Sequence, residues 1–418
     1  MKIYPGQWFL FLLLVSFFVS CSKSGGGGGG NGTGTTVYSA EITVQLADDK
    51  QLIQGFGCAT VFTPPNTSTL TPVEFDRLFG TAAGQVGLSL LRIRIAADDS
   101  WRATELNYAK EAIRNGARII ASPWSPPARM KTNNSLIGGK LITDSGAAYA
   151  RYLNDFAVYM ATNNAPVYAV SVQNEPDITV SYESCDWTAD EMRVFLRNHG
   201  QLVTATRLMA PESFNNNQAY VNTLLEDAAA ESHIDLVGGH IYGSGLAFNP
   251  VAKAKGKEVW MTEHLDTNYS YTASLNTAVE IHDCLTKAEF NAYCWWYGKR
   301  FYGPLGQDGQ VTKRGVVMSH FARFIRPGSV RLGTGANSRT DVLVSAYRNG
   351  TKRIIVAINK GSVTVSQKFQ LQGGTAGTFV PYVTTSSRNA EQGTAVNAAG
   401  NSVTIQLPPG SITTLVEQ

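Results

Sequence analysis

Three glutamates stand where a short apolar segment of the chain ends, a place from which a carboxylate can reach a substrate. Glu175 lies in VQNEPD at 172–177, Glu263 ends WMTE at 260–263, and Glu212 follows the apolar run at 206–210. Two facing carboxylates can split a glycosidic bond, because one with a raised pKa protonates the leaving oxygen while the other, kept ionised, attacks the anomeric carbon. We therefore predict catalytic roles for Glu175 and Glu263 and expect Glu212 to be structural or to support them.

Aromatic and polar residues follow other apolar runs and complete a candidate substrate site. These residues are Trp124, Asn174, His240, Tyr242 and Trp296. Aromatic rings stack on the faces of sugars, so Trp124 and Trp296 are predicted to bind substrate, with a place in the core as the alternative. His240 is expected either to donate to a carboxylate or to be structural.

Two arginines, Arg92 and Arg94, lie inside the apolar run at 90–96. A buried arginine needs a carboxylate partner. We expect at least one of them to neutralise the surroundings of the carboxylate that acts as nucleophile.

Eight apolar runs, mostly β-branched, alternate with longer amphipathic stretches. The runs are 53–57, 90–96, 117–122, 167–173, 206–210, 234–239, 257–262 and 291–296. Capping boxes at 71–74 and 188–191 mark the start of two of the intervening helices. Eight strand–helix units in about 275 residues predict a (β/α)8 TIM barrel, whose strand ends share one rim. A doubly wound open sheet is disfavoured, because no glycine-rich phosphate turn follows the first run.

After Pro327 the hydrophobic pattern changes to a period of two, which is typical of strands. The turn at Asn349-Gly350 between two such strands predicts a β-hairpin. Residues 37–45 alternate likewise and are predicted to join a side β-sandwich beside the barrel. The predicted domains are a signal peptide (1–20), a lipidated cysteine and glycine-rich linker (21–36), an N-terminal sandwich strand (37–48), the catalytic barrel (49–326) and the C-terminal β-sandwich (327–418).

The N-terminus has the pattern of an export signal. Lys2 precedes an apolar segment at 8–19 that is too short to span a bilayer. Ser20 is small and Cys21 follows it, as in bacterial lipoprotein signals, in which the cysteine is lipidated. We expect the protein to be exported and anchored through Cys21 to the bacterial outer membrane, on its periplasmic or cell-surface face, or otherwise to be secreted.

The composition excludes several classes of protein. The 418 residues include 35 basic and 32 acidic side chains, a balance that argues against nucleic-acid binding as the main task. The low charged fraction of 16%, with 40 Gly, 18 Phe, 17 Tyr and 7 Trp, excludes a disordered chain and a coiled coil. No metal or other cofactor is expected, and the sequence does not choose among the disulfide pairings of the remaining cysteines. These are Cys58, Cys185, Cys284 and Cys294.

Eight short segments form a combined motif set. They are QGFG at 54–57, ASPWSPP at 121–127, SVQNEPD at 171–177, GGHIYG at 238–243, WMTE at 260–263, AYCWWY at 292–297, KRG at 313–315 and RPGSVR at 326–331. The set resembles glycoside hydrolase family 30, in particular its bacterial glucuronoxylanase branch, over roughly residues 37–418. The resemblance implies a retaining endo-1,4-β-xylanase acting on (4-O-methyl)glucuronoxylan, with Glu175 as acid/base and Glu263 as nucleophile. It further implies that Asn174 bonds the sugar hydroxyl next to the reacting carbon.

The resemblance also places a glucuronate-binding arginine after the last barrel strand. In WWYGKRFYGP at 295–304, Arg300 matches that arginine and Tyr302 matches its neighbour. A guanidinium suits a carboxylate in bidentate geometry. The segment departs from the family pattern at Gly298, Lys299 and Phe301.

The loop after Glu263 is shorter than in the family, where it adds a serine to the uronate pocket; here Ser270 or Ser274 could substitute. We expect a monomer whose partner is the polysaccharide. One alternative is another retaining β-glycosidase of the family that acts on uronate-free xylan or β-glucan. An alternative of another class is a non-catalytic, surface glycan-binding lipoprotein.

Overall fold

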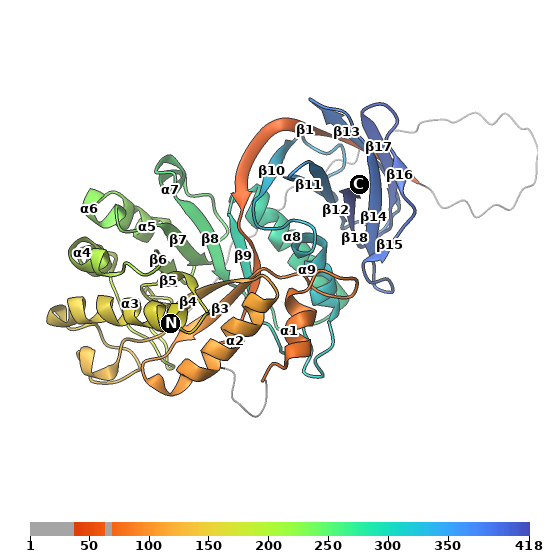
Figure 1. The fold of residues 1–418 in the computed structure, drawn as a ribbon. Helices are drawn as coiled ribbons and strands as arrows, with labels where there is room; N and C mark the ends of the chain where they lie inside the picture. The colour runs from red at the N-terminus through yellow and green to blue at the C-terminus, as the bar shows by residue number, and fades with distance from the viewer. Residues whose placement is uncertain (1–36, 63–68) are drawn as a thin grey trace, which may run out of the picture. The chain divides into compact units, whose positions relative to one another are not determined.

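Eight parallel strands close into a barrel in the computed structural model, which describes residues 37–62 and 69–418 (Figure 1). The strands are β2 (Gly55–Ala59), β3 (Leu90–Ile95), β4 (Arg118–Pro123), β5 (Val167–Ser171), β6 (Arg207–Ser213), β7 (Leu236–His240), β8 (Glu258–Glu263) and β9 (Ala292–Tyr297). The pairing of β9 with β2 closes the ring. The predicted TIM barrel is confirmed, and each strand begins within two residues of its predicted run. The predicted signal peptide and lipidated cysteine lie outside the described residues.

Helices follow the barrel strands, and most of them begin after a residue whose side chain caps the first turn. They are α1 (Pro72–Phe79), α2 (Arg102–Arg114), α3 (Gly146–Thr162), α4 (Ala189–His199), α5 (Gln218–Leu225), α6 (Ala228–Glu231), α7 (Pro250–Ala254), α8 (Tyr271–Thr286) and α9 (Lys313–Ala322). Both predicted capping boxes are confirmed, with Thr71 and Glu74 at the start of α1 and Thr188 and Glu191 at the start of α4.

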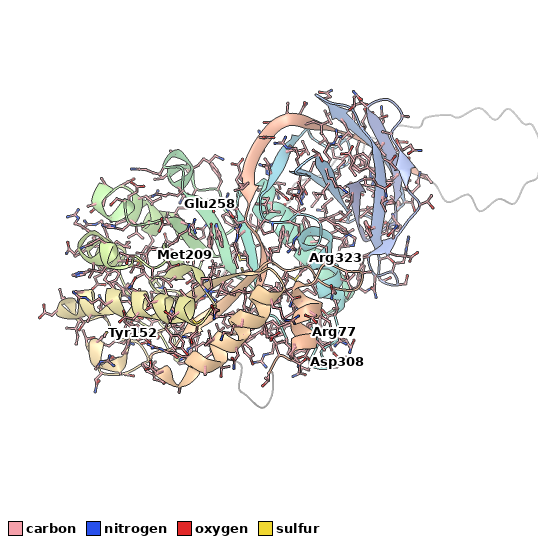
Figure 2. The ribbon with its side chains drawn as sticks, in the orientation of Figure 1. Arg77, Tyr152, Met209, Glu258, Asp308 and Arg323 are labelled. Atoms are coloured by element: carbon pink, nitrogen blue, oxygen red, sulfur yellow. The ribbon has the colours of Figure 1, made fainter. Side chains whose placement is uncertain are left out.

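Apolar side chains fill the barrel interior at the end where the strands begin. This cluster consists of Leu90, Ile120, Ala169, Met209, Leu236, Trp260, Ala292 and Cys294. The Trp260 ring stacks on Tyr168 at 5.5 Å between centroids, and its indole N–H donates to Glu258 at 2.9 Å. Met209 and Glu258 are labelled in Figure 2. Because this end is packed, a substrate can enter the barrel only at the rim formed by the carboxyl ends of the strands.

A second body is built from one ten-stranded sheet. Its strands are β1 (Tyr38–Ile53), β10 (Ser329–Thr334), β11 (Val342–Asn349), β12 (Lys352–Asn359), β13 (Val365–Gln372), β14 (Thr378–Thr384), β15 (Glu391–Gln392), β16 (Val396–Asn397), β17 (Ser402–Leu407) and β18 (Ser411–Glu417). The main path runs β15-β14-β18-β12-β11-β10-β1-β13-β17, with β16 paired to β14. Strands from both ends of this path, β14 with Phe379 and β17 with Val403, share one apolar core, so the sheet curls on itself.

The first strand, β1, lies between β10 and β13, antiparallel to the former and parallel to the latter. It continues to Ile53, five residues beyond the predicted end. The polar residues at 48–50 resemble a turn in the sequence, but the pairing with β10 is irregular between Gln45 and Leu52, and the strand carries them on this bulged stretch. The predicted hairpin at Asn349-Gly350 is present between β11 and β12, with Gly350 at a φ of 59°.

The four cysteines of the described region are buried and free. None of the helices within 37–62 and 69–418 is long and apolar enough to cross a membrane.

Helices α8 and α9 pack against the curled sheet. The phenol of Tyr271 on α8 donates to the carbonyl of Gly410 at 2.6 Å. His320 on α9 is fully buried, with Nδ1 2.9 Å from Thr414 Oγ1 and Nε2 2.8 Å from Thr384 Oγ1. Burial lowers the pKa of His320 to about 3. The imidazole therefore joins barrel and sheet in its neutral form.

Acid should lower the stability that the buried His320 gives to the contact between barrel and sheet. The unfolded chain binds a proton at His320 below about pH 6.5, whereas the folded chain does not until about pH 3, so stability is lost as the pH falls between these values. We expect His320 to contribute a loss of up to about 1.4 kcal/mol per pH unit in the free energy of unfolding. Urea denaturation at pH 7 and pH 5 measures it. The drop should shrink in His320→Asn but not in His233→Gln; an equal drop in all three proteins would contradict the assignment.

Candidate active site

The backbone presents two of the three glutamates in an unusual conformation. Glu175 has a φ of 48° and Glu212 a φ of 61°, both in the left-handed region that ordinary residues seldom occupy. The two turns support each other, because the Glu175 N–H donates to the Glu212 carbonyl at 3.0 Å. Strain of this kind persists where surrounding structure fixes it and is concentrated at functional sites.

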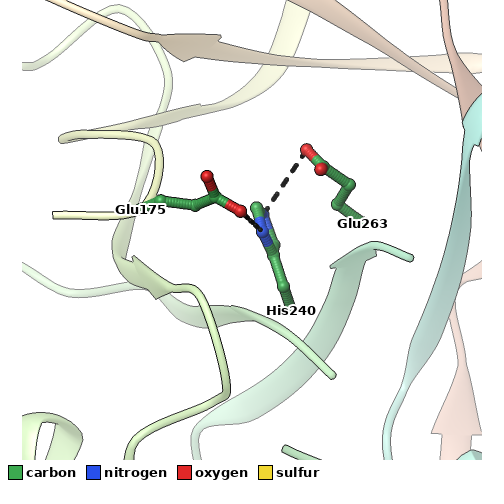
Figure 3. Close-up of side chains that lie close together, drawn as sticks. All are labelled: Glu175, His240 and Glu263. Carbon is green, nitrogen blue, oxygen red and sulfur yellow. Dashed lines mark hydrogen bonds and ion pairs between the residues drawn. The ribbon is translucent and has the colours of Figure 1, made fainter. Parts of the chain in front are cut away.

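Glu175 and Glu263 face each other across His240 (Figure 3). His240 Nδ1 lies 3.0 Å from Glu175 Oε1, and its Nε2 lies 3.9 Å from Glu263 Oε2. One oxygen of each glutamate and one nitrogen of the histidine all lie within 4.8 Å of one another. The structure thus brings both predicted catalytic carboxylates to one point on the rim.

Arg92 supplies the fixed positive charge of the site. Its guanidinium is fully buried and donates to Glu263 Oε2 at 2.7 Å, to Glu212 Oε1 at 3.0 Å and to Asn174 Oδ1 at 2.6 Å. The prediction that a buried arginine pairs with a carboxylate here is confirmed. Glu212 contacts Arg92 from within the protein at 0% exposure, which suits the expected supporting role.

Two tyrosine hydroxyls donate to the remaining carboxylate oxygens of Glu263 and Glu175. Tyr242 donates to Glu263 Oε1 at 2.9 Å, and its ring stacks on Phe214 at 4.8 Å. Tyr182 donates to Glu175 Oε2 at 3.0 Å and is itself 48% exposed. The sequence analysis missed Tyr182, which lies seven residues beyond Glu175 in an irregular loop.

Burial and charge shift the pKa values of the site in opposite directions. Burial acts to raise the pKa of Glu212, but Arg92 and His240 outweigh it and lower the value to about 2. Burial also acts against the charged form of Glu175, yet hydrogen bonds from His240 and Tyr182 leave its pKa below the ordinary value. Burial raises the pKa of Glu263, with the charges of His240 and Arg92 acting in the opposite direction.

For His240, burial and the surrounding charges act on the pKa in the opposite directions to those at Glu212. Burial acts to lower the pKa of His240, but the charge of Glu263, the hydrogen bond with Glu175 and the nearby carboxylate of Glu212 raise it to about 9. The spacing of Glu175, His240 and Glu263 would also admit a metal ion. However, Arg92, Tyr242 and Tyr182 already donate to the two carboxylates, so the group fits a hydrogen-bonded network better than a set of metal ligands.

The two candidate tryptophans differ in exposure. Trp124 is 3% exposed, packs against Trp296 with ring centroids 5.9 Å apart, and lies under Arg92 at 4.7 Å. Trp296 is partly exposed. Trp124 therefore shields the guanidinium, while Trp296 offers more ring surface to a sugar.

Arg300 lies in the loop between β9 and α9. Its guanidinium sits 4.4 Å from the centre of the Tyr297 ring, and its backbone N–H donates to the Leu305 carbonyl at 3.0 Å. Tyr302, two residues on, is nearly buried. Lys299 pairs with Glu74 at 2.6 Å, which ties this loop to α1.

Phe301, next to Arg300 in the chain, forms an exposed aromatic pair with Tyr269. The sequence analysis named Phe301 only as a departure from the family pattern and did not single out Tyr269. Tyr269 is 72% exposed and Phe301 is 50% exposed, and their rings meet edge to face at 5.9 Å. The short loop after Glu263, together with the phenylalanine at 301, is the sequence signal that could have indicated this aromatic pair. Of the two candidate serines, Ser274 is buried and donates back to the Ser270 carbonyl, whereas Ser270 caps α8 by accepting from the Ala273 N–H.

The chain is similar to known carbohydrate-active enzymes over most of its length. The glycosyl hydrolase family 30 TIM-barrel domain model matches residues 88–258. Glucuronoxylanase XynC of Bacillus subtilis (strain 168) is 37% identical over 392 residues, which cover 90% of this chain and 92% of that protein.

Two solved structures share the fold. A family 30 subfamily 8 xylanase, Xyn30A from Clostridium acetobutylicum, has a TM-score of 0.85 at 35% identity and covers 90% of this chain and 99% of that one. A family 30 endoxylanase from Clostridium papyrosolvens C71 has a TM-score of 0.83 at 38% identity, with 90% and 100% covered. The chain therefore belongs to glycoside hydrolase family 30, and it is a glycoside hydrolase.

Proposed function

We propose that this hydrolase is a retaining endo-1,4-β-xylanase that cuts (4-O-methyl)glucuronoxylan and recognises the glucuronate branch. The observation that carries the proposal is the pairing of Glu175 and Glu263 on the barrel rim, with one oxygen of each within 4.8 Å. Retaining enzymes hold their carboxyl groups about 5–5.5 Å apart, whereas inverting enzymes need about 6.5–9.5 Å to admit a water molecule. The names of the similar proteins support xylan as the substrate.

In the proposed mechanism Glu175 gives a proton to the leaving oxygen while Glu263 attacks the anomeric carbon. Glu175 then takes a proton from the water that releases the sugar from Glu263. Asn174 supports the transition state, because Arg92 binds its Oδ1 and thereby turns the amide N–H groups toward a sugar hydroxyl. Arg92 also stabilises the ionised form of Glu263 through the 2.7 Å bond.

The purified chain, incubated with glucuronoxylan and in parallel with uronate-free arabinoxylan, tests the proposal. Mass spectrometry sizes the products and proton NMR reads the configuration of the first product. We expect products from glucuronoxylan that each carry one uronate at a fixed distance from the reducing end, released with retained configuration. Inverted products would refute the mechanism, and no cleavage of either polymer would favour the glycan-binding alternative.

Arg300 is proposed to bind the carboxylate of the branch, beside Tyr302 and the exposed pair Tyr269 and Phe301. Replacing Arg300 by alanine should lower kcat/KM on glucuronoxylan about 10- to 100-fold, the value of a charge-assisted hydrogen bond. Activity on neutral xylo-oligosaccharides should change little. Arg114→Ala, at an exposed arginine on α2 that pairs with Asp76, is the matched control. Equal losses on both substrates would show that Arg300 does not read the uronate and would favour the uronate-free alternative.

We also propose that the protein is a monomer, exported and held at the outer membrane by a lipid on Cys21, with the glycine-rich linker at 22–36 as a tether. The small residue Ser20 between the apolar segment at 8–19 and Cys21 supports this proposal. Expression of Cys21→Ser should move the protein from the membrane fraction to a soluble one. Protease added to whole cells should degrade the protein if it lies on the cell-surface face and leave it intact if it lies on the periplasmic face.

Sedimentation of residues 37–418 tests the oligomeric state, and we expect the mass of one chain.

A further inference from the structure

His240, at the end of β7, lies among three carboxylates, of which Glu212 is on β6, Glu263 ends β8 and Glu175 lies in the loop after β5. Besides the 3.0 Å contact to Glu175, its Nε2 is 3.8 Å from Glu212 Oε1 and 3.9 Å from Glu263 Oε2. The imidazole is fully buried, and the Tyr242 ring lies edge-on to it at 6.0 Å. Nδ1 is thus in hydrogen-bond contact with Glu175 (Figure 3), whereas Nε2 has no hydrogen-bond partner within the described residues and lies just beyond that distance from Glu212 and Glu263.

The charges around His240 do not balance without a bound proton. Facing it are the carboxylates of Glu175, Glu212 and Glu263, against the single guanidinium of Arg92. Buried like charges this close cannot all remain ionised without further positive charge. A proton on Glu175 or on Glu263 would neutralise one carboxylate only, whereas a proton on His240 is attracted by all three at once. The raised pKa of His240 and the lowered pKa of Glu175 agree with the second arrangement.

We propose that His240 is a positioning residue that holds, in the resting enzyme, the proton that Glu175 later delivers. The inference rests on the proposed role of Glu175 as general acid. When substrate binds, the Nδ1–H bond of the imidazolium breaks and an O–H bond forms on Glu175, which leaves a neutral imidazole. The carboxyl group then passes this proton to the glycosidic oxygen while Glu263 bonds to the anomeric carbon and the old C–O bond breaks.

The second half of the cycle restores the proton. Water gives its proton to Glu175 as its oxygen displaces Glu263 from the sugar, and Glu263 regains its negative charge. That charge again favours the imidazolium, so the proton returns to Nδ1. Tyr182, which donates to the other oxygen of Glu175, stabilises the carboxylate in the resting state. Its exposure allows the substrate to displace it.

Nitrogen-15 NMR of the full chain with labelled histidine tests where the proton lies. The chain has six histidines, and the signals missing from His240→Asn assign His240. We expect both ring nitrogens of His240 to be protonated from pH 5 to pH 8. Glu175→Gln should lower the pH at which His240 loses its proton by about one unit or more. His264, which pairs with Glu280 and not with Glu175, is the internal control, and its signals should not change in Glu175→Gln. An unprotonated nitrogen on His240 at pH 7 would overturn the proposal.

The pH profile of His240→Asn gives a second readout. The asparagine amide can still donate to Glu175 but cannot hold a proton. We expect the alkaline limb of kcat/KM on xylan to move down by about one pH unit or more, because Glu175 must then keep its own proton. A purely structural role would lower the rate by the same factor at every pH and would contradict the proposal. Failure of the wild-type chain to cut xylan would instead refute the proposed function, and the NMR signal of His240 would remain readable.

Discussion

Replacing Glu263 by glutamine is expected to lower kcat on glucuronoxylan by at least about 10⁴-fold, because an amide cannot attack the anomeric carbon. The fold should survive, since glutamine fills the same volume, its carbonyl can still accept from Arg92, and its NH2 group can donate to the hydroxyl of Tyr242. The measurement is kcat, with thermal unfolding as the check on folding.

Glu105→Gln is the matched control for this variant. Glu105 is as deeply buried, at 1% exposure, but it lies on α2, and burial raises the pKa of Glu105 to about 8. At neutral pH the glutamine therefore resembles the protonated acid, and activity should stay within about twofold of the wild type. If both variants lost activity alike, general destabilisation would explain the result and the assignment of Glu263 as nucleophile would fall.

A chemical rescue separates the nucleophile from a residue that only supports it. Glu263→Ala opens a space on the face of the sugar from which Glu263 attacks, and a small anion such as azide can occupy it. With an activated aryl β-xyloside and azide, the product should be the α-configured xylosyl azide. A β-configured azide, or none, would contradict the proposed role.

The sequence was informative where one local pattern decides the outcome. Alternating apolar runs and capped helices predicted the barrel, and capping boxes such as Thr71 with Glu74 recur in the structure because they involve residues only three apart. Glu175 and Glu263 could be placed on one rim because the carboxyl ends of all eight strands of a TIM barrel meet there. The burial of Arg92 inside an apolar run likewise required a carboxylate partner.

The rest depended on contacts between segments that are far apart in the sequence. Tyr182 reaches Glu175 because the irregular loop between them folds back. No periodic pattern in the sequence predicts that conformation. The pairing of Tyr269 with Phe301 joins two loops whose conformations are set by packing and not by local propensity. From the sequence, His240 could be a donor or a structural residue, and the choice needed its distances to three carboxylates in different parts of the chain.

Replacing Glu175 by alanine should lower kcat/KM on xylan by about 10²–10⁴-fold, the usual contribution of a general acid. The size of the loss should depend on the leaving group. An aryl β-xyloside whose phenol leaves as a stable anion needs no proton from Glu175, so the step that forms the bond to Glu263 should be nearly as fast as in the wild type. Release from Glu263 should then become slow, because no base activates the water.

That imbalance makes the role of Glu175 visible in the first seconds of reaction. We expect a burst of phenol equal to the enzyme concentration, followed by a slow steady state. Azide should accelerate the steady state and give the β-configured xylosyl azide, because it attacks the sugar on Glu263 from the face that Glu175 has vacated. This configuration is opposite to that expected with Glu263→Ala, so the two alanine variants test each other. Loss of activity that is equal for xylan and the aryl xyloside, with no burst and no rescue, would assign Glu175 to binding or folding and would remove the acid/base role on which the proposed mechanism depends.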